Sequence, residues 1–183
     1  MSELRVGLGI DAHAFAAGVP LVLGGVAIEH GRGLAGHSDG DVIAHALIDA
    51  LLGAAGLGDI GSLFPSSDER WRGADSLDLL ARAYGEVRGA GWALVNADCV
   101  LIGEEPRIAA RREEMQEQLA AALSVEPDAW PCGPRLPTGS ALRAVVRAWP
   151  PRLWRCWKDK LARVGRGAHE RPRRRFGFLR LRA

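Results

Sequence analysis

Hydrophobic and polar positions repeat with two different periods in the first third of the chain. Residues 4–10 alternate with a period of two, which predicts a β-strand. Residues 20–28 contain two short apolar runs on either side of a Gly-Gly pair, a pattern typical of a β-hairpin. After residue 38 the apolar positions become nearly continuous as far as Leu52, which predicts a long buried helix.

The ends of this long helix are marked by polar residues and glycines. Ser38 followed three residues later by Asp41 resembles a capping box, so we expect the helix to begin there. Gly53 or Gly56 lies near its end. His45 lies inside the otherwise apolar stretch, where a histidine needs a partner or a ligand.

Further elements alternate along the next seventy residues. A second helix is predicted over 77–88 with Ser76 as its cap, and a third from Pro106 to Leu123, because proline is tolerated in the first turn of a helix. Between them, residues 93–102 are expected to form a strand. One face of that strand would carry Val95, Ala97, Cys99 and Leu101.

Length and composition restrict the classes of protein that this chain can form. It has 183 residues, of which 48% are hydrophobic, enough for one compact domain. No run of 18 apolar residues occurs, and the first residues do not resemble a signal peptide. The three cysteines are widely spaced and form neither a disulfide framework nor a metal-binding knuckle. A cytoplasmic protein without a membrane partner is therefore expected, with Cys99 in the core.

The net charge of +2 hides a sharp asymmetry. Residues 1–130 hold nine arginines, no lysine and 20 acidic residues, whereas residues 131–183 hold thirteen arginines, two lysines and two acidic residues. An acidic body with a basic nucleic-acid-binding tail is one interpretation. The other interpretation is that the two parts do not share a reading frame.

Three polar residues in apolar settings suggest a metal site. Asp11 and His13 are two residues apart in extended chain and therefore face the same way. With His45 they supply two nitrogens and one carboxylate, a pattern typical of catalytic zinc with an open fourth position. Asp41 or Asp49, at i−4 and i+4, could accept the second ring N–H of His45. The alternatives are that His45 is a satisfied core histidine and that the DxH pattern arises by chance.

Two other segments could contact a phosphate or another ligand. Residues 37–41, His-Ser-Asp-Gly-Asp, place an imidazole and a hydroxyl at a helix N-terminus, where backbone N–H groups favour anions. The alternative is plain capping with solvated acids. Residues 58–65 contain two glycines, an acid and an aromatic residue, which suits either close approach to a ligand or a simple turn.

Taken together, these segments resemble one enzyme family. The sequences DAHAF at 11–15, HSDGDVIAHALIDALLGAAGLGDIGSLFP at 37–65 and GADS at 73–76 are similar to those of the 2-C-methyl-D-erythritol 2,4-cyclodiphosphate synthases of the non-mevalonate isoprenoid pathway. The resemblance covers about residues 5–128. It implies an α+β fold, a single two-layer domain with a small β-sheet covered by helices, and a homotrimer with active sites between protomers.

The resemblance also implies roles for individual residues. Asp11, His13 and His45 would bind Zn²⁺ or another divalent cation, and His37 would stabilise the transition state. Mg²⁺ or Mn²⁺ would accompany the substrate diphosphate. Ser66 stands where the family usually has an acid, and Arg107 where it usually has lysine. The substrate-binding residues would be Asp11, Ala12, His13, His37, Ser38, Asp59, Ile60, Gly61, Phe64, Pro65, Ser66, Ser67, Asp68, Gly103, Glu104, Glu105, Pro106, Arg107, Ile108 and Ala109.

The implied reaction is a metal-assisted intramolecular phosphoryl transfer. The 2-phosphate of 4-diphosphocytidyl-2-C-methyl-D-erythritol attacks the β-phosphorus of the same molecule, and CMP leaves. Positioning and neutralisation of charge supply most of the catalysis in reactions of this class.

The resemblance stops after Trp130. The family continues with a threonine-rich strand and a glycine-rich segment, but residues 131–159 carry prolines and arginines that argue against a central strand. Read with one consistent offset, the codons of 134–138 can give Thr-Thr-Thr-Asp, and those of 143–148 can give Gly-Arg-Gly-Glu-Gly. We therefore expect an incomplete synthase-like domain at 1–130 and an out-of-frame basic tail at 131–183, with the family's C-terminal strand and helix region lost or replaced.

Three hypotheses follow from these features. The first is the synthase, a phosphorus-oxygen lyase. The second is a nucleic-acid-binding module that uses Arg163 to Arg182. A shifted reading frame, however, explains the basic composition of that tail without a nucleic-acid partner. The third is a metal-binding scaffold that is catalytically impaired because the threonine and acid motif is missing. If the tail is out of frame, Trp149, Trp154 and Trp157 should be weakly buried.

Overall fold

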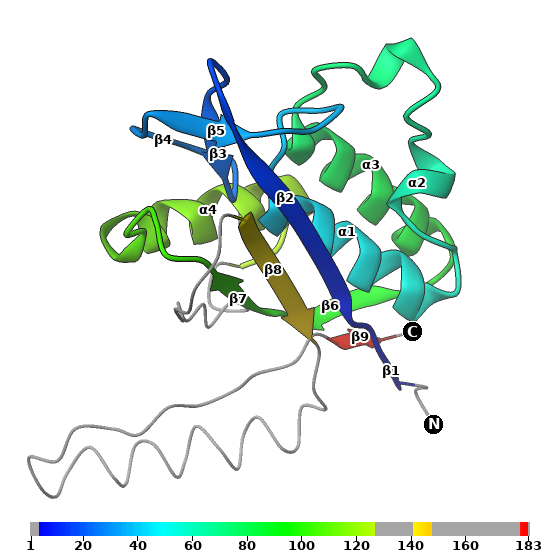
Figure 1. Cartoon of the computed structure of the whole chain (residues 1–183). Coiled ribbons are helices and arrows are strands. Elements are labelled where there is room, and N and C mark those ends of the chain that lie inside the picture. Colours follow the sequence, from blue (N-terminus) through cyan, green and yellow to red (C-terminus); the bar gives the residue numbers. More distant parts are fainter. Residues whose placement is uncertain (1–3, 127–140, 148–179, 183) are drawn as a thin grey trace, which may run out of the picture.

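The computed structural model describes residues 4–126, 141–147 and 180–182 (Figure 1). The strands are β1 (Leu4–Val6), β2 (Gly9–Ala17), β3 (Leu21–Leu23), β4 (Val26–Ile28), β5 (Arg32–Leu34), β6 (Ala93–Asn96), β7 (Asp98–Ile102), β8 (Ala141–Arg147) and β9 (Arg180–Arg182). The helices are α1 (Val42–Ala55), α2 (Ile60–Leu63), α3 (Ser76–Gly89) and α4 (Arg112–Leu123), with 3-10 turns η1 (Glu69–Trp71) and η2 (Ala109–Arg111).

The strands form small antiparallel sheets, and in Figure 1 β2 and β8 cross in front of α1 while β6, β7 and β9 lie below the helices. One sheet has the order β5-β2-β8-β7, a second has the order β1-β9-β6, and β3 pairs with β4. The hairpin predicted over 20–28 is confirmed, with Gly24 and Gly25 in the left-handed region at φ 56° and 75°. The architecture confirms the expected α+β class.

Strand β8 corrects one expectation. It lies within the stretch where prolines and arginines argued against a strand, yet it pairs with β2 on one side and β7 on the other. Its seven residues contain no proline, and the nearest prolines are at 137 and 150. A segment without proline can pair its backbone donors and acceptors with both neighbouring strands, so the prolines on either side do not prevent 141–147 from forming a central strand. Residues 131–140 and the three tryptophans of the tail lie outside the described residues.

Helix α1 forms the centre of the core. Almost all of its side chains are buried, and Leu47, Ile48 and Leu51 are fully so. Its N-cap is Asp41 and not Ser38, because the Asp41 carboxylate accepts hydrogen bonds from the backbone N–H groups of Ile43 and Ala44. The helix ends at Gly56 in the left-handed conformation, as one of the two expected glycines.

The Asp41 carboxylate also joins α1 to the β3–β4 hairpin. It accepts hydrogen bonds from the N–H groups of Gly24 at 2.9 Å and Gly25 at 2.7 Å. Its complete burial raises the pKa of the carboxyl group, while the hydrogen bonds from Gly25 and Gly24 act in the opposite direction. One buried side chain therefore satisfies four backbone donors and fixes where α1 begins.

Two glycines bring the first strands unusually close to α1. A Cβ atom on Gly7 would lie 1.9 Å from the carbonyl oxygen of Ala50, and one on Gly9 would lie 1.8 Å from that of Ala46. Only glycine can occupy either position at this separation. The approach places the start of β2 directly on the helix that carries His45.

Three other expectations on the elements change in detail. Asp75 caps α3 through the N–H of Leu77, so Ser76 is the first helical residue. The strand expected over 93–102 is divided into β6 and β7. The third helix begins at Arg112 after η2, since Pro106 fits a loop as well as a first turn. Within the described ranges, no helix is both long and apolar enough to cross a bilayer.

Candidate metal centre

Asp11, His13 and His45 come together where β2 crosses α1. Asp11 and His13 extend from the same face of β2, and His45 reaches them from the first turns of α1. Asp11 Oδ2 lies 2.9 Å from His13 Nε2 and 3.0 Å from His45 Nδ1, and the two imidazole nitrogens are 3.4 Å apart. One ligand atom from each residue lies within 4.8 Å of the others, so the three residues could hold a metal ion.

The tautomer of His13 is set from outside the cluster. Its Nδ1 donates to the carbonyl oxygen of Ala35, which can only accept, so the free imidazole presents the lone pair of Nε2 to Asp11 and His45. The hydrogen bond with Asp11 raises the pKa of His13, burial lowers it, and the Ala35 carbonyl raises it further. A cation or a proton at this point is thus electrostatically favoured.

The charge of Asp11 adds to this preference. Burial acts to raise the pKa of Asp11, but hydrogen bonds and charge interactions with His13 and His45 outweigh it and hold the pKa far below its usual range. The carboxylate is therefore ionised. Two imidazole nitrogens and one carboxylate oxygen match the donors of a catalytic zinc site, so the residues present fit the predicted divalent cation.

The second nitrogen of His45 has partners that the sequence did not indicate. Its Nε2 lies 2.9 Å from the hydroxyl of Ser38 and 2.9 Å from the hydroxyl of Ser76. The expectation that Asp41 or Asp49 would accept its N–H is wrong. The Asp41 carboxylate accepts hydrogen bonds from the hairpin and from the first turn of α1 instead, and Asp49 accepts one from the N–H of Ile60.

The sequence predicted Ser76 only as a helix cap and gave neither Ser76 nor Asp39 a role beside His45. Ser76, at the start of α3, is fully buried, and its hydroxyl donates to Asp39 Oδ1. Asp39 Oδ2 accepts from the N–H of Ser76 at 3.0 Å, and Oδ1 accepts from the N–H of Asp41 at 3.1 Å. The signal that could have found them is the pairing of the two motifs HSDGD and GADS.

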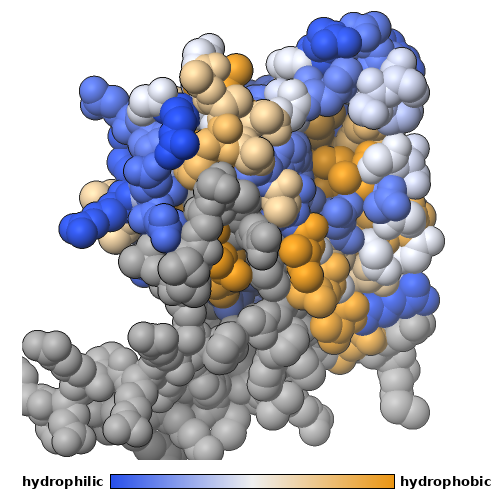
Figure 2. Space-filling view, viewed as in Figure 1, coloured by the Kyte–Doolittle hydropathy of each residue, from blue (hydrophilic) through white to orange (hydrophobic). Residues whose placement is uncertain are grey.

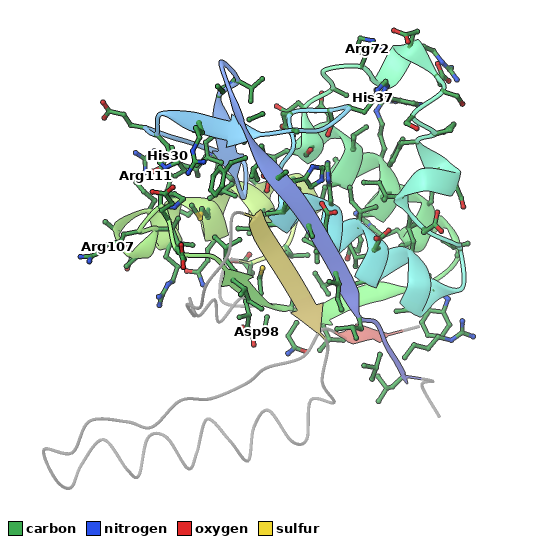
Figure 3. All side chains as sticks on the ribbon, viewed as in Figure 1. His30, His37, Arg72, Asp98, Arg107 and Arg111 are labelled. Carbon is green, nitrogen blue, oxygen red and sulfur yellow. The ribbon has the colours of Figure 1, made fainter. Side chains whose placement is uncertain are left out.

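His37 lies beside the loop before α3, close to Arg72 in Figure 3. Its carbonyl oxygen accepts from the N–H of Gly73 at 2.8 Å. The side chain is half-buried, and its Nε2 has no hydrogen-bond partner among the described residues. This nitrogen is therefore a buried polar atom without a hydrogen-bond partner in the described part of the chain.

The two predicted ligand loops are ordered by their own side chains. Asp59 caps α2 through the N–H of Ser62, and its hydrogen bonds with Ser62 lower its pKa. Phe64 is buried with its ring edge-on to Trp71 at 5.0 Å between centroids. Asp68 binds the guanidinium of Arg70.

The loop over 103–109 is held by His30 of the β4–β5 connection and by Arg32, the first residue of β5. Glu105 lies 2.5 Å from Arg32 Nη2 and 3.6 Å from His30 Nε2, and the Arg32 contact is the main cause that lowers its pKa. Arg32 also lies over the ring of Phe15 at 4.8 Å. Figure 3 shows His30, Arg107 and Arg111 on one side of β2 and His37 on the other. Sequence reasoning missed His30 and Arg32.

A family model and individual proteins of known sequence match this chain over the same region. Residues 4–130 match the model of the YgbB family. A 2-C-methyl-D-erythritol 2,4-cyclodiphosphate synthase of Rubrobacter xylanophilus is 60% identical over 129 residues, which cover 69% of this chain and 78% of that protein.

Two solved structures have the same fold. A 2C-methyl-D-erythritol-2,4-cyclodiphosphate synthase in a CDP-bound form superposes with a TM-score of 0.73 at 38% identity, over 78% of this chain and 97% of that one. The bifunctional IspDF of Campylobacter jejuni has a TM-score of 0.76 at 37% identity. That match covers 80% of this chain and 42% of the longer bifunctional protein.

Proposed function

Because the chain belongs to the YgbB family, and thus to the 2-C-methyl-D-erythritol 2,4-cyclodiphosphate synthases, we propose that it catalyses the reaction of that family. It converts 4-diphosphocytidyl-2-C-methyl-D-erythritol 2-phosphate into the 2,4-cyclodiphosphate and CMP. An oxygen of the 2-phosphate forms a bond to the β-phosphorus, and the bond from that phosphorus to the CMP oxygen breaks. The observation that carries the proposal is the convergence of Asp11, His13 and His45.

The three ligands hold Zn²⁺ or another divalent cation in this proposal. When bound, the cation neutralises negative charge on a phosphate oxygen. Asp11 brings one negative charge to the cluster, and His13 presents its free Nε2 because Ala35 accepts from Nδ1. A second cation, Mg²⁺ or Mn²⁺, accompanies the substrate diphosphate.

Residues around the centre position the substrate. Ser38, whose hydroxyl lies 2.9 Å from His45 Nε2, contacts a substrate phosphate in this proposal, and the unpartnered Nε2 of His37 stabilises charge that develops during transfer. The remaining substrate contacts are proposed for Asp11, Ala12 and His13, for Asp59 to Gly61, and for Phe64 to Asp68. The loop Gly103–Ala109, held by Arg32 through Glu105, receives the cytidine end.

We also propose that the protein works as a homotrimer. The side chains of Leu4, Val6, Leu8 and Ile10 alternate from β1 through the short connection into the start of β2 and are 43–59% exposed. Figure 2 shows apolar surface along this part of the molecule. A row of exposed apolar residues on a sheet is typical of a face covered by another subunit. Active sites between protomers would then be completed by residues of two chains.

The remaining parts of the proposal concern the tail and the location. We place the domain boundary near residue 130, with an out-of-frame segment at 131–183 that has no nucleic-acid partner. We place the protein in the cytoplasm. The coding DNA around codon 130 tests the boundary, since a clean alternative frame would support it and a continuous frame in several isolates would contradict it.

The activity is tested by CMP release from the synthetic substrate with zinc and magnesium present. We expect the full chain to release CMP, H45A to lose activity with its cation, and H37Q to be slower by about 10²–10³-fold. D78N, at an exposed position on α3, is the control and should keep the wild-type rate. No release by the full chain above the rate without protein would contradict the proposal.

A further inference from the structure

We propose that Ser76, fixed by Asp39, is a positioning residue that selects the tautomer of His45 that can bind the cation. The inference rests on the proposed metal site and extends it to a residue that contacts neither cation nor substrate. It follows from the direction of the hydrogen bonds in the chain Asp39–Ser76–His45.

The direction is determined at the Asp39 end. An ionised carboxylate only accepts hydrogen bonds, so the hydroxyl hydrogen of Ser76 points to Asp39 Oδ1. The oxygen of Ser76 then has only lone pairs for His45 Nε2, which lies 2.9 Å away. Nε2 must therefore carry a hydrogen and donate it to Ser76.

The consequence appears at the other nitrogen of the ring. In neutral imidazole only one nitrogen carries a hydrogen, so Nδ1 of His45 has a free lone pair. That atom lies 3.0 Å from Asp11 Oδ2 and 3.4 Å from His13 Nε2. Without the bond to Ser76, Nδ1–H could donate to Asp11 and occupy the point where the cation binds.

Ser38 does not impose the same choice, although its hydroxyl is also 2.9 Å from His45 Nε2. Ser38 is half-buried, and no carboxylate bonds to it among the residues that the structure describes. Its hydroxyl can donate to Nε2 or accept from it. Ser76 is fully buried, and Asp39 is held by the N–H groups of Ser76 and Asp41 as well. Only the Ser76 bond has a fixed direction.

Zinc affinity of the full chain, measured by competition with a chromophoric chelator, tests the inference. S76A should weaken zinc binding by about 10–100-fold, the usual effect of removing a partner of a metal-binding histidine. S38A is the matched control, since it removes a hydroxyl at the same distance from Nε2, and its effect should be much smaller. Equal effects of S76A and S38A, or wild-type affinity of S76A, would overturn the inference.

A second pair of variants covers the case in which S76A does not fold. S76T keeps the hydroxyl and S76V has nearly the same shape without it, so S76T should bind zinc more tightly than S76V. The double variant D39N/S76A should bind zinc as tightly as the weaker-binding of the two single variants. Both changes break the same chain of hydrogen bonds from Asp39 through Ser76 to His45, so their effects should not add. Additive losses in the double variant would contradict the coupling.

Nitrogen chemical shifts of ¹⁵N-labelled histidines test the tautomer directly in the unmutated chain. The resonance missing from H45A identifies His45. With zinc bound, we expect the metal on Nδ1 and a slowly exchanging hydrogen on Nε2, and zinc on Nε2 would overturn the inference. Wild-type zinc affinity of H45A would instead contradict the metal site itself, which separates failure of the proposed function from failure of the role of Ser76.

Discussion

Gly9 and Ala46 are packed backbone to backbone, since a Cβ atom on Gly9 would lie 1.8 Å from the Ala46 carbonyl oxygen. The metal ligands are neighbours of this contact in the sequence. Asp11 follows Gly9 by two residues, and His45 directly precedes Ala46. The separation of β2 and α1 at this contact therefore decides whether the carboxylate and the imidazole can reach one cation.

We predict that G9A destabilises the fold by about 3 kcal/mol or more, because the new methyl group meets backbone that cannot move aside. Urea unfolding followed by circular dichroism measures the loss. G53A is the control, since Gly53 lies in α1 with open space around it and alanine favours helices by about 0.5–1 kcal/mol. An unchanged free energy of unfolding in G9A would contradict the close approach.

The cap of α1 gives a second prediction. D41A removes the acceptor of four backbone N–H groups in a fully buried position and should cost about 3 kcal/mol or more. D75A removes the exposed cap of α3 and should cost about 1 kcal/mol. Thermal unfolding of both variants gives the comparison. Similar losses would show that burial of the Asp41 carboxylate does not matter.

Binding of the cation should stabilise the folded chain. The ligands come from β2 and α1, so zinc binds the folded state and not the unfolded one. At a free zinc concentration a hundred times the dissociation constant, we expect about 2.7 kcal/mol of added stability, lost on adding a chelator. H45A should show no such gain, whereas H37Q should keep it. A zinc-induced shift in the melting temperature of H45A equal to that of the wild type would count against this centre.

The apolar row on β1 and β2 gives a prediction on assembly. I10E places a charge on that row and should shift the protein from trimer to monomer in light scattering after size exclusion. V19E changes an exposed apolar residue between β2 and β3 and should leave the trimer intact. A trimer of I10E as stable to dilution as the wild type would place the interface elsewhere.

The tail gives a prediction on rate. A variant with the alternative frame restored after codon 130 should release CMP faster than the present chain, because under the proposed frameshift it regains the threonine and acid groups that the family resemblance implies. Removing one such contact commonly lowers the rate about 10²–10³-fold. Rates are compared at equal protein concentration with zinc and magnesium. Equal rates would contradict either the shifted frame or the role proposed for the missing segment.

Local patterns predicted much of this fold. The hairpin over 20–28 and the shared face of Asp11 and His13 depend on neighbours in the sequence, so periodicity and glycine placement were sufficient. For the end of α1 they left two glycines, of which Gly56 is the cap. Local geometry and one helix histidine suggested the metal triad, and the family resemblance decided between that interpretation and a core histidine.

Contacts between distant segments were not predictable in the same way. The cap at Asp41 depends on the hairpin that it binds, and a capping box at Ser38 had the same local pattern. The Ser76 partner of His45 is 31 residues away, and the pairing of Glu105 with Arg32 spans 73. Strand β8 was missed because its two partners, and not its own composition, determine its pairing.

The row of Leu4, Val6, Leu8 and Ile10 has a consequence for the separated protomer. These residues alternate on extended backbone, and their apolar side chains face water when no neighbour covers them. Exposed apolar strands of this kind promote non-specific aggregation. In the proposed trimer, solubility is then a property of the assembly, and variants that separate the protomers but keep this row apolar should precipitate at concentrations where the assembled protein stays clear.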